Sequence, residues 1–332
     1  MKDYAKEYQG KKILITGGAG CIGSNLTRAL SEAGAKKITV LDDLSSSDRW
    51  NVPDAPNVEF VEGSVLDEVV LKQVFFEEPE YVFHLAALFA NQNSIDHPET
   101  DLMVNGLGVL KVLQYSHTAK IEKFVFASSG CSVYGSQAPL PLKEDFVSIN
   151  LDTPYQITKL LGELYCNFFY NYYSLPVVRV RYFNVYGPGE VPGKYRNVIP
   201  NFIYWALHNK ALPIMGTGEE TRDWTFVNDI IDGTLRVGVT SDTVGEAFNL
   251  ASETETKVID IANTVNDIVG NNNGVEYVRR RGWDKIVKRR ASVEKARKFL
   301  GYEPRTEIKE GIQRTVDWFL ANREKIEKSA RF

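Results

Sequence analysis

A glycine-rich turn between a predicted strand and a predicted helix constrains this chain more than any other feature. Residues 13–16 form an apolar run typical of a strand buried on both faces. From residue 22 to residue 33 the apolar side chains recur at helical spacing. Glycines in the turn between them let a diphosphate approach the N–H groups at the start of the helix. The residues expected to hold a dinucleotide there are Gly17, Gly20, Cys21, Ile22 and Gly23.

The alternation of strand and helix continues through the N-terminal half. Further strands are predicted at residues 38–41, 58–61, 81–85, 124–127 and 177–181, with helices at about 99–119 and from about 154. Such alternation with short links predicts a Rossmann-like, doubly wound parallel sheet with helices on both faces.

The composition changes after about residue 184, where Gly187-Pro188-Gly189 and Val191-Pro192-Gly193 interrupt the pattern. We therefore expect a dinucleotide-binding domain over residues 1–184 and a smaller C-terminal α/β domain that binds substrate. Residues 227–251 again read as a helix followed by a strand, and we expect them to rejoin the sheet. The substrate domain then comprises residues 185–226 and 252–332.

Asp42 stands at the end of the second predicted strand, 19 residues after Gly23. A carboxylate in this position accepts hydrogen bonds from the ribose hydroxyls of an adenosine and repels a 2′-phosphate. The sequence therefore predicts NAD rather than NADP as the cofactor. Asp43 reads as an ordinary loop carboxylate.

Tyr155 and Lys159 lie one helical turn apart near a predicted helix start at Thr153 and Pro154. A phenol with a pKa of about 10 is a poor base at neutral pH. An ammonium group about 5 Å away favours the phenolate by roughly 3 kcal/mol at an effective dielectric constant near 20. We therefore expect Lys159 to lower the pKa of Tyr155, so that the pair moves a proton on and off a hydroxyl.

The chain resembles the extended short-chain dehydrogenase/reductase family, in particular its nucleotide-sugar 4-epimerases of the UDP-glucose/UDP-galactose type. The resemblance spans nearly the whole chain. The matching motifs, in order, are Thr16 to Gly23, Asp42, His84-Leu85-Ala86-Ala87, Asn105, Ser128-Ser129 with Val133-Tyr134-Gly135, Tyr155 with Lys159, Arg181-Tyr182-Phe183-Asn184, Arg222-Asp223, Phe226 to Asp229, Arg280-Arg281-Gly282 and Leu300-Gly301-Tyr302.

The resemblance also implies roles for single residues. Ser64 and Val65 would line the adenine, and Leu85, Ala86 and Ala87 the diphosphate. Asn105 would support Lys159 through a water molecule, and Phe183 would lie by the nicotinamide. The residues implied to bind the nucleotide part of the substrate are Asn184, Asn197, Val198, Arg222 and Arg280. Guanidinium groups suit a diphosphate because they form bidentate, charge-assisted hydrogen bonds.

The chain departs from the family pattern at Gly130, 25 residues before Tyr155, where the family has a serine or threonine. The missing hydroxyl normally bonds the sugar oxygen that becomes a ketone. Three interpretations are open: Ser129, or else Ser132, supplies the hydroxyl; a water molecule does; or glycine makes room for a different sugar. We favour Ser129. The same loop has Cys131 and Ser132 where the family's 4,6-dehydratases carry an acidic pair and its decarboxylases a glutamate.

These features favour epimerisation at C4 of a UDP-hexose through a 4-keto intermediate. The alternative enzymes are a nucleotide-sugar 4-dehydrogenase, a dehydratase, a decarboxylase or an epimerase of CDP-, GDP- or dTDP-sugars. The remaining alternative is a non-catalytic NAD-binding regulator. The resemblance also implies a homodimer that uses the helix bearing Tyr155.

The composition excludes several other classes. The net charge of −4 gives no global attraction to nucleic acid. The basic run at 279–290, which contains Arg280, could be a solvated basic face or a nucleic-acid patch, and its lack of interleaved aromatic residues beyond Trp283 disfavours nucleic acid. No apolar run is long enough to span a membrane, and the first ten residues carry no apolar signal segment. Three widely spaced cysteines suit a reducing cytoplasm, and the four histidines show no metal-ligand spacing. We expect a cytoplasmic protein without a metal or membrane partner.

Overall fold

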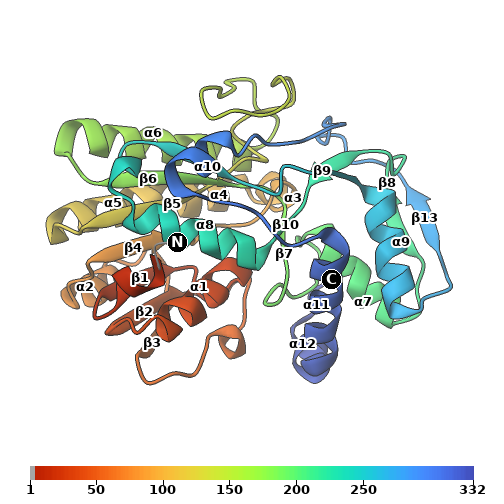
Figure 1. Ribbon diagram of the computed structural model, residues 1–332, viewed down its shortest axis with the longest axis horizontal. Helices are drawn as coiled ribbons and strands as arrows, with labels where there is room; N and C mark the ends of the chain where they lie inside the picture. Colours follow the sequence, from red (N-terminus) through yellow and green to blue (C-terminus); the bar gives the residue numbers. More distant parts are fainter. Residues whose placement is uncertain (1–3) are drawn as a thin grey trace.

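Seven parallel strands form the central sheet of the computed structural model, which describes residues 4–332 (Figure 1). Their order across the sheet is β11-β6-β5-β4-β1-β2-β3. The strands are β1 (Lys12–Thr16), β2 (Lys37–Asp42), β3 (Val58–Glu62), β4 (Tyr81–His84), β5 (Lys123–Ser129), β6 (Val177–Tyr182) and β11 (Ala247–Leu250). Residues 1–3, where the predicted N-terminal domain begins, lie outside the described range.

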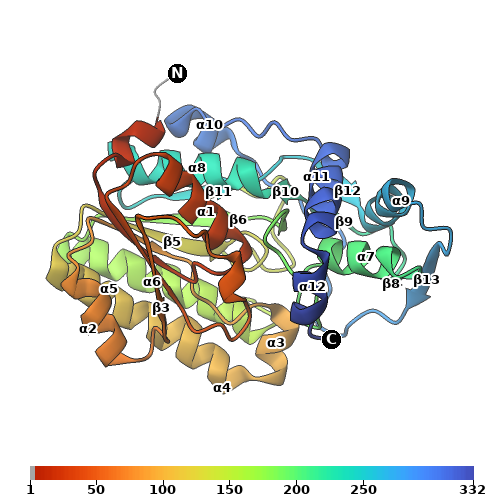
Figure 2. The ribbon, with the colours of Figure 1, turned by 90° about the horizontal axis from the view of Figure 1, so that it is seen from below.

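Helices cover both faces of this sheet, as Figure 2 shows. One face packs against α1 (Cys21–Glu32) and α8 (Val227–Val239), and the other against α2 (Glu68–Phe76), α5 (Gly108–Ala119) and α6 (Pro154–Tyr173). The apolar side chains of β1 show why helices must cover both faces of the sheet. Ile13 and Ile15 point into the core beneath α1, whereas Leu14 belongs to the core on the opposite face. The predicted Rossmann-like fold is confirmed.

The helix predicted over about residues 99–119 is confirmed as one continuous helical stretch over residues 98–119, but its middle is π-helical. The structure divides it into α4 (Pro98–Asp101), a π-helical segment, η3 (Leu102–Leu107), and α5. Asn105 lies in this π-helical segment. Its side-chain Oδ1 accepts a hydrogen bond from Leu88 N, outside the helix, at 2.8 Å. A π-helical turn of this kind is frequent at functional sites, and periodicity alone does not reveal it.

Apart from the 3₁₀ turns and α10 (Glu294–Leu300), which packs on β11 and α8, the remaining elements lie beside the sheet, on the side where the carboxyl ends of its strands meet (Figure 1). The short strands pair as β7 (Val185–Tyr186) with β10 (Thr225–Phe226), β8 (Leu212–Met215) with β13 (Val275–Val278), and β9 (Thr221–Asp223) with β12 (Glu255–Lys257). The helices are α3 (Asn91–Asp96), α7 (Val198–Leu207), α9 (Val258–Val269), α10 (Glu294–Leu300), α11 (Ile308–Ala321) and α12 (Arg323–Ser329), with 3₁₀ turns η1 (Tyr4–Tyr8), η2 (Arg49–Asn51) and η4 (Ser241–Thr243).

Strand β11 is reached only after the chain has passed through part of this second region. It pairs with β6, with Ala247 opposite Arg179 and Leu250 opposite Tyr182. Within residues 4–332, none of the helices is both long and apolar enough to cross a membrane. The same range contains no group of three or more His, Cys, Asp or Glu side chains placed to hold a metal ion.

Candidate active site

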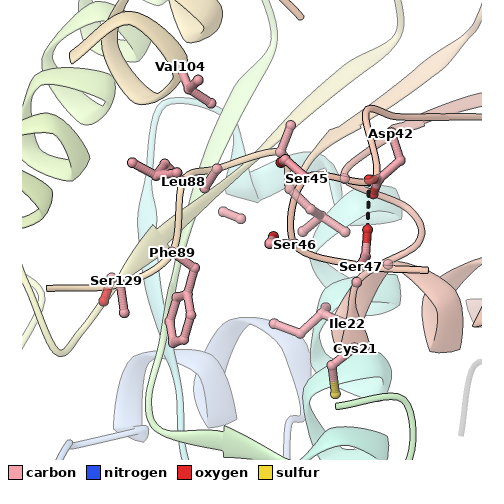
Figure 3. A pocket seen from close by; sticks show the side chains of 18 of the residues that line it. Cys21, Ile22, Asp42, Ser45, Ser46, Ser47, Leu88, Phe89, Val104 and Ser129 are labelled. Carbon is pink, nitrogen blue, oxygen red and sulfur yellow. Dashed lines mark hydrogen bonds between the residues drawn. The ribbon is translucent and has the colours of Figure 1, made fainter. Parts of the chain in front are cut away.

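A pocket opens where the carboxyl ends of β1, β2, β4, β5 and β6 meet the second region. Ligands of open parallel sheets bind at this edge. Figure 3 shows part of its wall, with Asp42 and the following serines on one side and Ser129 and Phe89 on the other. The predicted residues that line it are Gly17, Gly20, Cys21, Ile22, Gly23, Asp42, Ser64, Val65, Leu85, Ala86, Ala87, Ser129, Tyr155, Lys159, Asn184 and Asn197.

The glycine-rich turn has the shape that a diphosphate needs. Gly17 has a φ of +72°, and a Cβ atom there would lie 2.5 Å from Ala86 N. A Cβ atom on Gly23 would overlap Gly17 O. Gly20 is the N-cap of α1 and brings no side chain over the first turn. The backbone at the start of α1 is thus accessible from the pocket, as an anion-binding helix terminus requires.

Asp42 is buried at the end of β2 and organises the adjacent loop. Its Oδ2 accepts a hydrogen bond from Ala19 N at 2.9 Å. Its Oδ1 accepts from Leu44 N at 2.9 Å and from Ser47 Oγ at 2.8 Å. A carboxylate accepts about four hydrogen bonds, so Asp42 retains capacity for a ligand hydroxyl. The residues present therefore fit the adenosine end of NAD.

The first turn of α6 places Tyr155 and Lys159 in the same wall. Thr153 Oγ1 caps the helix by accepting from Gln156 N at 3.3 Å, and Tyr155 N donates to Ser94 Oγ at 3.0 Å. Lys159 Nζ donates to Ala127 O at 2.9 Å and lies 5.6 Å from the centre of the Tyr155 ring. The two side chains are adjacent, as their spacing predicts.

The expected effect of Lys159 on the phenol is wrong for the protein on its own. Burial raises the pKa of Tyr155 well above its usual value, and the nearby Asp101 carboxylate raises it further. Burial also lowers the pKa of Lys159 to about 8. Desolvation disfavours the charged forms of both groups. A bound cation beside the hydroxyl would favour the phenolate.

Asn105 lies behind the wall rather than in it. Its Nδ2 donates to Leu88 O at 3.1 Å and to Asp101 Oδ1 at 2.7 Å. Both of its amide hydrogens are therefore used by protein atoms. Asp101 in turn accepts a hydrogen bond from Thr158 Oγ1 at 2.7 Å and raises the pKa of Lys159 through its charge. Asn105 thus reaches Lys159 through Asp101, a route that sequence reasoning missed.

An aromatic ring fills the space into which a side chain at position 130 would extend. A Cβ atom on Gly130 would overlap the ring of Phe183, which is fully buried behind the loop instead of lining the pocket. The space at Gly130 is therefore filled, so glycine there does not make room for a larger sugar. Ser129 lines the pocket, and its Oγ accepts from Ser132 Oγ at 3.0 Å, whereas Ser132 is fully buried. Ser129 as the source of the hydroxyl stays a prediction.

We expect Gly130→Ser to impair the protein rather than restore the family pattern. The new Cβ has to displace Phe183 from a packed core, which typically costs about 1–3 kcal/mol of stability. Movement of the Ser129–Cys131 segment should also lower turnover by roughly tenfold. Thermal unfolding and steady-state kinetics test both effects. Turnover that rises in Gly130→Ser with an unchanged melting temperature would contradict this account.

The two arginines expected at the substrate lie beyond the wall and bond to protein groups. Arg222 donates to Thr221 O at 2.8 Å and to Asp284 Oδ1 at 3.2 Å. Arg280 donates to Ile286 O at 2.6 Å and lies 3.5 Å from the same Asp284 carboxylate. Asp284 therefore joins the two guanidinium groups. Val198, the first residue of α7, also lies outside the wall but follows Asn197, which is in it.

Several residues of the site were missed by sequence reasoning. Ser45, Ser46 and Ser47 line the pocket, and their position directly after Asp42 was the available signal. Cys131 also lines it, with its Sγ 3.1 Å from Asn184 Oδ1.

Arg289 is a further residue that was missed, and it supports the loop of Ser129. Its side chain is buried and donates to Gly130 O at 2.7 Å and to Gly135 O at 3.2 Å. Glu190 and Arg196 also line the pocket, and no local pattern marked them.

Comparison with known proteins places this geometry in a family. Residues 13–251 match the model of the NAD dependent epimerase/dehydratase family. The chain is 34% identical over 311 residues to a UDP-glucose 4-epimerase of Mycolicibacterium smegmatis, covering 93% of this chain and 98% of that protein. More distant relatives include a UDP-N-acetyl-alpha-D-glucosaminuronate decarboxylase of Bacillus cytotoxicus at 30% identity and a dTDP-D-glucose 4,6-dehydratase of Bos taurus at 29%.

Solved structures agree over nearly the whole chain. An epimerase of Methanothermobacter thermautotrophicus superposes with a TM-score of 0.98 at 56% identity, covering 99% of this chain and 98% of that one. The Bordetella bronchiseptica enzyme WbmF, in complex with NAD⁺ and UDP, superposes with a TM-score of 0.86 at 37% identity, covering 98% and 96%. Both comparisons extend through the second region as well as the sheet.

Proposed function

Because the chain belongs to the NAD dependent epimerase/dehydratase family, we propose that it inverts C4 of a UDP-hexose of the UDP-glucose/UDP-galactose type. The observation that carries the proposal is the position of Tyr155, Lys159 and Ser129 in one pocket with the glycine-rich turn. A proton acceptor beside a dinucleotide cradle suits the oxidation and reduction of a sugar hydroxyl. The relative and the neighbour that carry UDP-glucose and UDP in their names support the nucleotide.

In the proposed reaction, Tyr155 takes the proton of the C4 hydroxyl as C4 loses a hydride. NAD, when bound, supplies the acceptor and later the donor of that hydride. Lys159 stabilises the phenolate, and Ser129 donates a hydrogen bond to the C4 oxygen. The sugar turns while Arg222 and Arg280 hold its diphosphate, and Tyr155 returns the proton to the new alcohol. One hydride and one proton leave and return, so the isomerisation needs no added oxidant.

The loop after β5 argues against dehydration and decarboxylation. Those reactions move protons or carbon dioxide at atoms next to a ketone and need an additional acid or base. At the corresponding positions this chain has Cys131 and Ser132. Ser132 is fully buried with its hydroxyl directed to Ser129, so it faces no substrate atom. We therefore prefer the epimerase to the activities of the more distant relatives.

The proposal is tested by incubating the purified protein with a panel of nucleotide sugars, without added NAD, in D₂O. The expected result by proton NMR is a second UDP-hexose with no deuterium bound to carbon. Deuterium at C3 or C5, or loss of water or carbon dioxide, would contradict the proposed reaction. Net accumulation of NADH would instead indicate a 4-dehydrogenase.

We also propose that the protein forms a homodimer through α6 and the neighbouring η3. Ile157, Leu164, Phe168 and Tyr172 are exposed on α6 at helical spacing, and Leu102 and Met103 are exposed beside them. A contiguous apolar surface of this kind is typical of a protein–protein interface. Since α6 also carries Tyr155, the interface would support the catalytic helix.

Leu164→Arg is expected to convert the dimer into a monomer, because it places a charge in the centre of an apolar interface. Light scattering coupled to size exclusion measures the change. Phe76→Arg on α2, a similarly exposed apolar position on another helix, serves as the control and should leave the mass unchanged. A wild-type protein that is monomeric at micromolar concentration would contradict the proposed dimer.

A further inference from the structure

Arg196 is a cationic side chain in the pocket wall to which nothing above gives a role. It lies in the loop between β7 and α7, which belongs to the second region, and it is partly buried. Its backbone N–H donates to Gly193 O at 3.1 Å, but its guanidinium group makes no hydrogen bond or ion pair among residues 4–332. Partly buried charges are normally paired, so a guanidinium group left unpaired in a pocket wall indicates an anionic ligand.

The loop that carries Arg196 is fixed against the start of α1. Gly189 packs on this helix so closely that a Cβ atom there would lie 3.4 Å from Cys21 Cα. Glu190 Oε1 accepts a hydrogen bond from Asn197 Nδ2 at 2.9 Å, which ties the two ends of residues 190–197 together. Cys21 and Arg196 are close enough that a charge on the Cys21 thiol affects the pKa of Arg196. Arg196 therefore lies near the helix terminus of the dinucleotide cradle.

The charges of the pocket wall leave few groups that could balance a diphosphate. Within the described part of the chain, the carboxylates in the wall are those of Asp42, Asp43 and Glu190, and its cationic side chains are those of Lys159 and Arg196. Lys159 donates to Ala127 O at 2.9 Å and lies beside Tyr155. The N–H groups at the start of α1 carry only a partial positive charge. Arg196 is thus the wall cation that has no bond to the protein.

We propose that the Arg196 guanidinium group binds the diphosphate of NAD together with the backbone N–H groups at the start of α1. Arginine suits this ligand because it donates two parallel, charge-assisted hydrogen bonds to phosphate oxygens. The substrate diphosphate is the other anion to consider. Arg222 and Arg280, which we propose for it, lie outside this wall and meet at Asp284, whereas Arg196 takes no part in that cluster. The cofactor would then be held by the second region as well as by the sheet.

Arg196→Gln tests this inference because it removes the charge and keeps a polar side chain. In calorimetric titrations of the cofactor-free protein, we expect the Kd for NAD to rise by about 10- to 100-fold, since charge-assisted hydrogen bonds are lost. The Kd for ADP should rise by a similar factor, because ADP carries a diphosphate but no nicotinamide. The variant should also carry less NAD than the wild type after purification.

Two further variants separate the charge of Arg196 from the structure of its loop. Arg196→Lys keeps the charge and should recover most of the affinity for NAD. Lys194→Gln is the matched control in the same loop. Lys194 is exposed, donates to Tyr195 Oη at 2.9 Å and lies 3.5 Å from Asp96, outside the wall of this pocket. Its loss should leave the affinity for NAD unchanged.

Titration of UDP into the NAD-saturated proteins distinguishes the two possible sources of the diphosphate. We expect the affinity for UDP to be the same in the wild type and in Arg196→Gln. A loss of UDP affinity with unchanged NAD affinity would overturn the inference by assigning Arg196 to the substrate. Unchanged ADP affinity would overturn it by placing the contact elsewhere on the cofactor.

Structural damage has its own signature. Equal losses of NAD affinity in Arg196→Gln and Arg196→Lys, with a lower melting temperature of both cofactor-free proteins, would overturn the inference. These binding measurements need no turnover. The assignment of Arg196 can therefore fail while C4 epimerisation stands, and it can hold if the protein converts no nucleotide sugar.

Discussion

Replacing Tyr155 by phenylalanine is expected to lower turnover by about 10²–10⁴-fold while NAD remains bound. The ring of Tyr155 packs edge-on against Phe89, and phenylalanine preserves that contact. Only the hydroxyl that takes the substrate proton is removed. Steady-state kinetics on a UDP-hexose, together with the NAD released on denaturation, measures the two parts of the prediction.

Tyr186→Phe is the control for this experiment. Tyr186 is another buried tyrosine, and its hydroxyl makes one long hydrogen bond to Ile308 O at 3.5 Å, away from the pocket. Its loss should leave turnover within a few-fold of the wild type. If Tyr155→Phe turns over as fast as Tyr186→Phe, the proposed proton transfer is wrong.

Replacing Asp42 by alanine is expected to weaken NAD binding by about 10- to 100-fold. One hydrogen bond to a charged group contributes about 1.5–3 kcal/mol, and the variant also releases the loop that Asp42 holds through Leu44 N and Ser47 Oγ. The purified variant should carry little NAD, and added NAD should restore activity. The NAD content after gel filtration and the activity at increasing NAD measure the effect.

Asp43→Ala tests whether NAD binding depends on the buried position of Asp42 or only on a negative charge nearby. Asp43 is the adjacent carboxylate, but it is exposed and accepts a hydrogen bond only locally, from Ser45 N at 3.0 Å. The Asp43 variant should retain its NAD. Equal loss of NAD in both variants would mean that the local negative charge, rather than the buried position of Asp42, governs binding.

The cofactor half of the site could be predicted because its signals are local. The strand of Ile13 to Thr16, the glycines after it and Asp42 are read within about 30 residues, and the parallel sheet then brings them together. The turn that bears Tyr155 is equally local, because Thr153, Pro154 and Gln156 mark its start. These parts of the structure agree with the sequence-based expectations.

The parts that differ depend on contacts between distant segments. The sequence does not show that Phe183 fills the space beside Gly130 or that burial raises the pKa of Tyr155. The side chain of Asn105 in the π-helical turn bonds to Leu88, which lies in another segment. Glu190 escaped notice because its neighbours Asn197 and Cys21 approach it only in the folded chain.

The hydrogen bond from Arg289 to Gly130 has a consequence for the order of events during protein synthesis. The two residues are separated by 159 positions in the chain. When the sheet strands β1 to β6 have emerged from the ribosome, the segment that supports the Ser129 loop has not yet been made. The glycine-rich turn, Asp42, Tyr155 and Lys159 have all been made by then. The support for the Ser129 loop is therefore completed only after Arg289 has been added, near the end of translation.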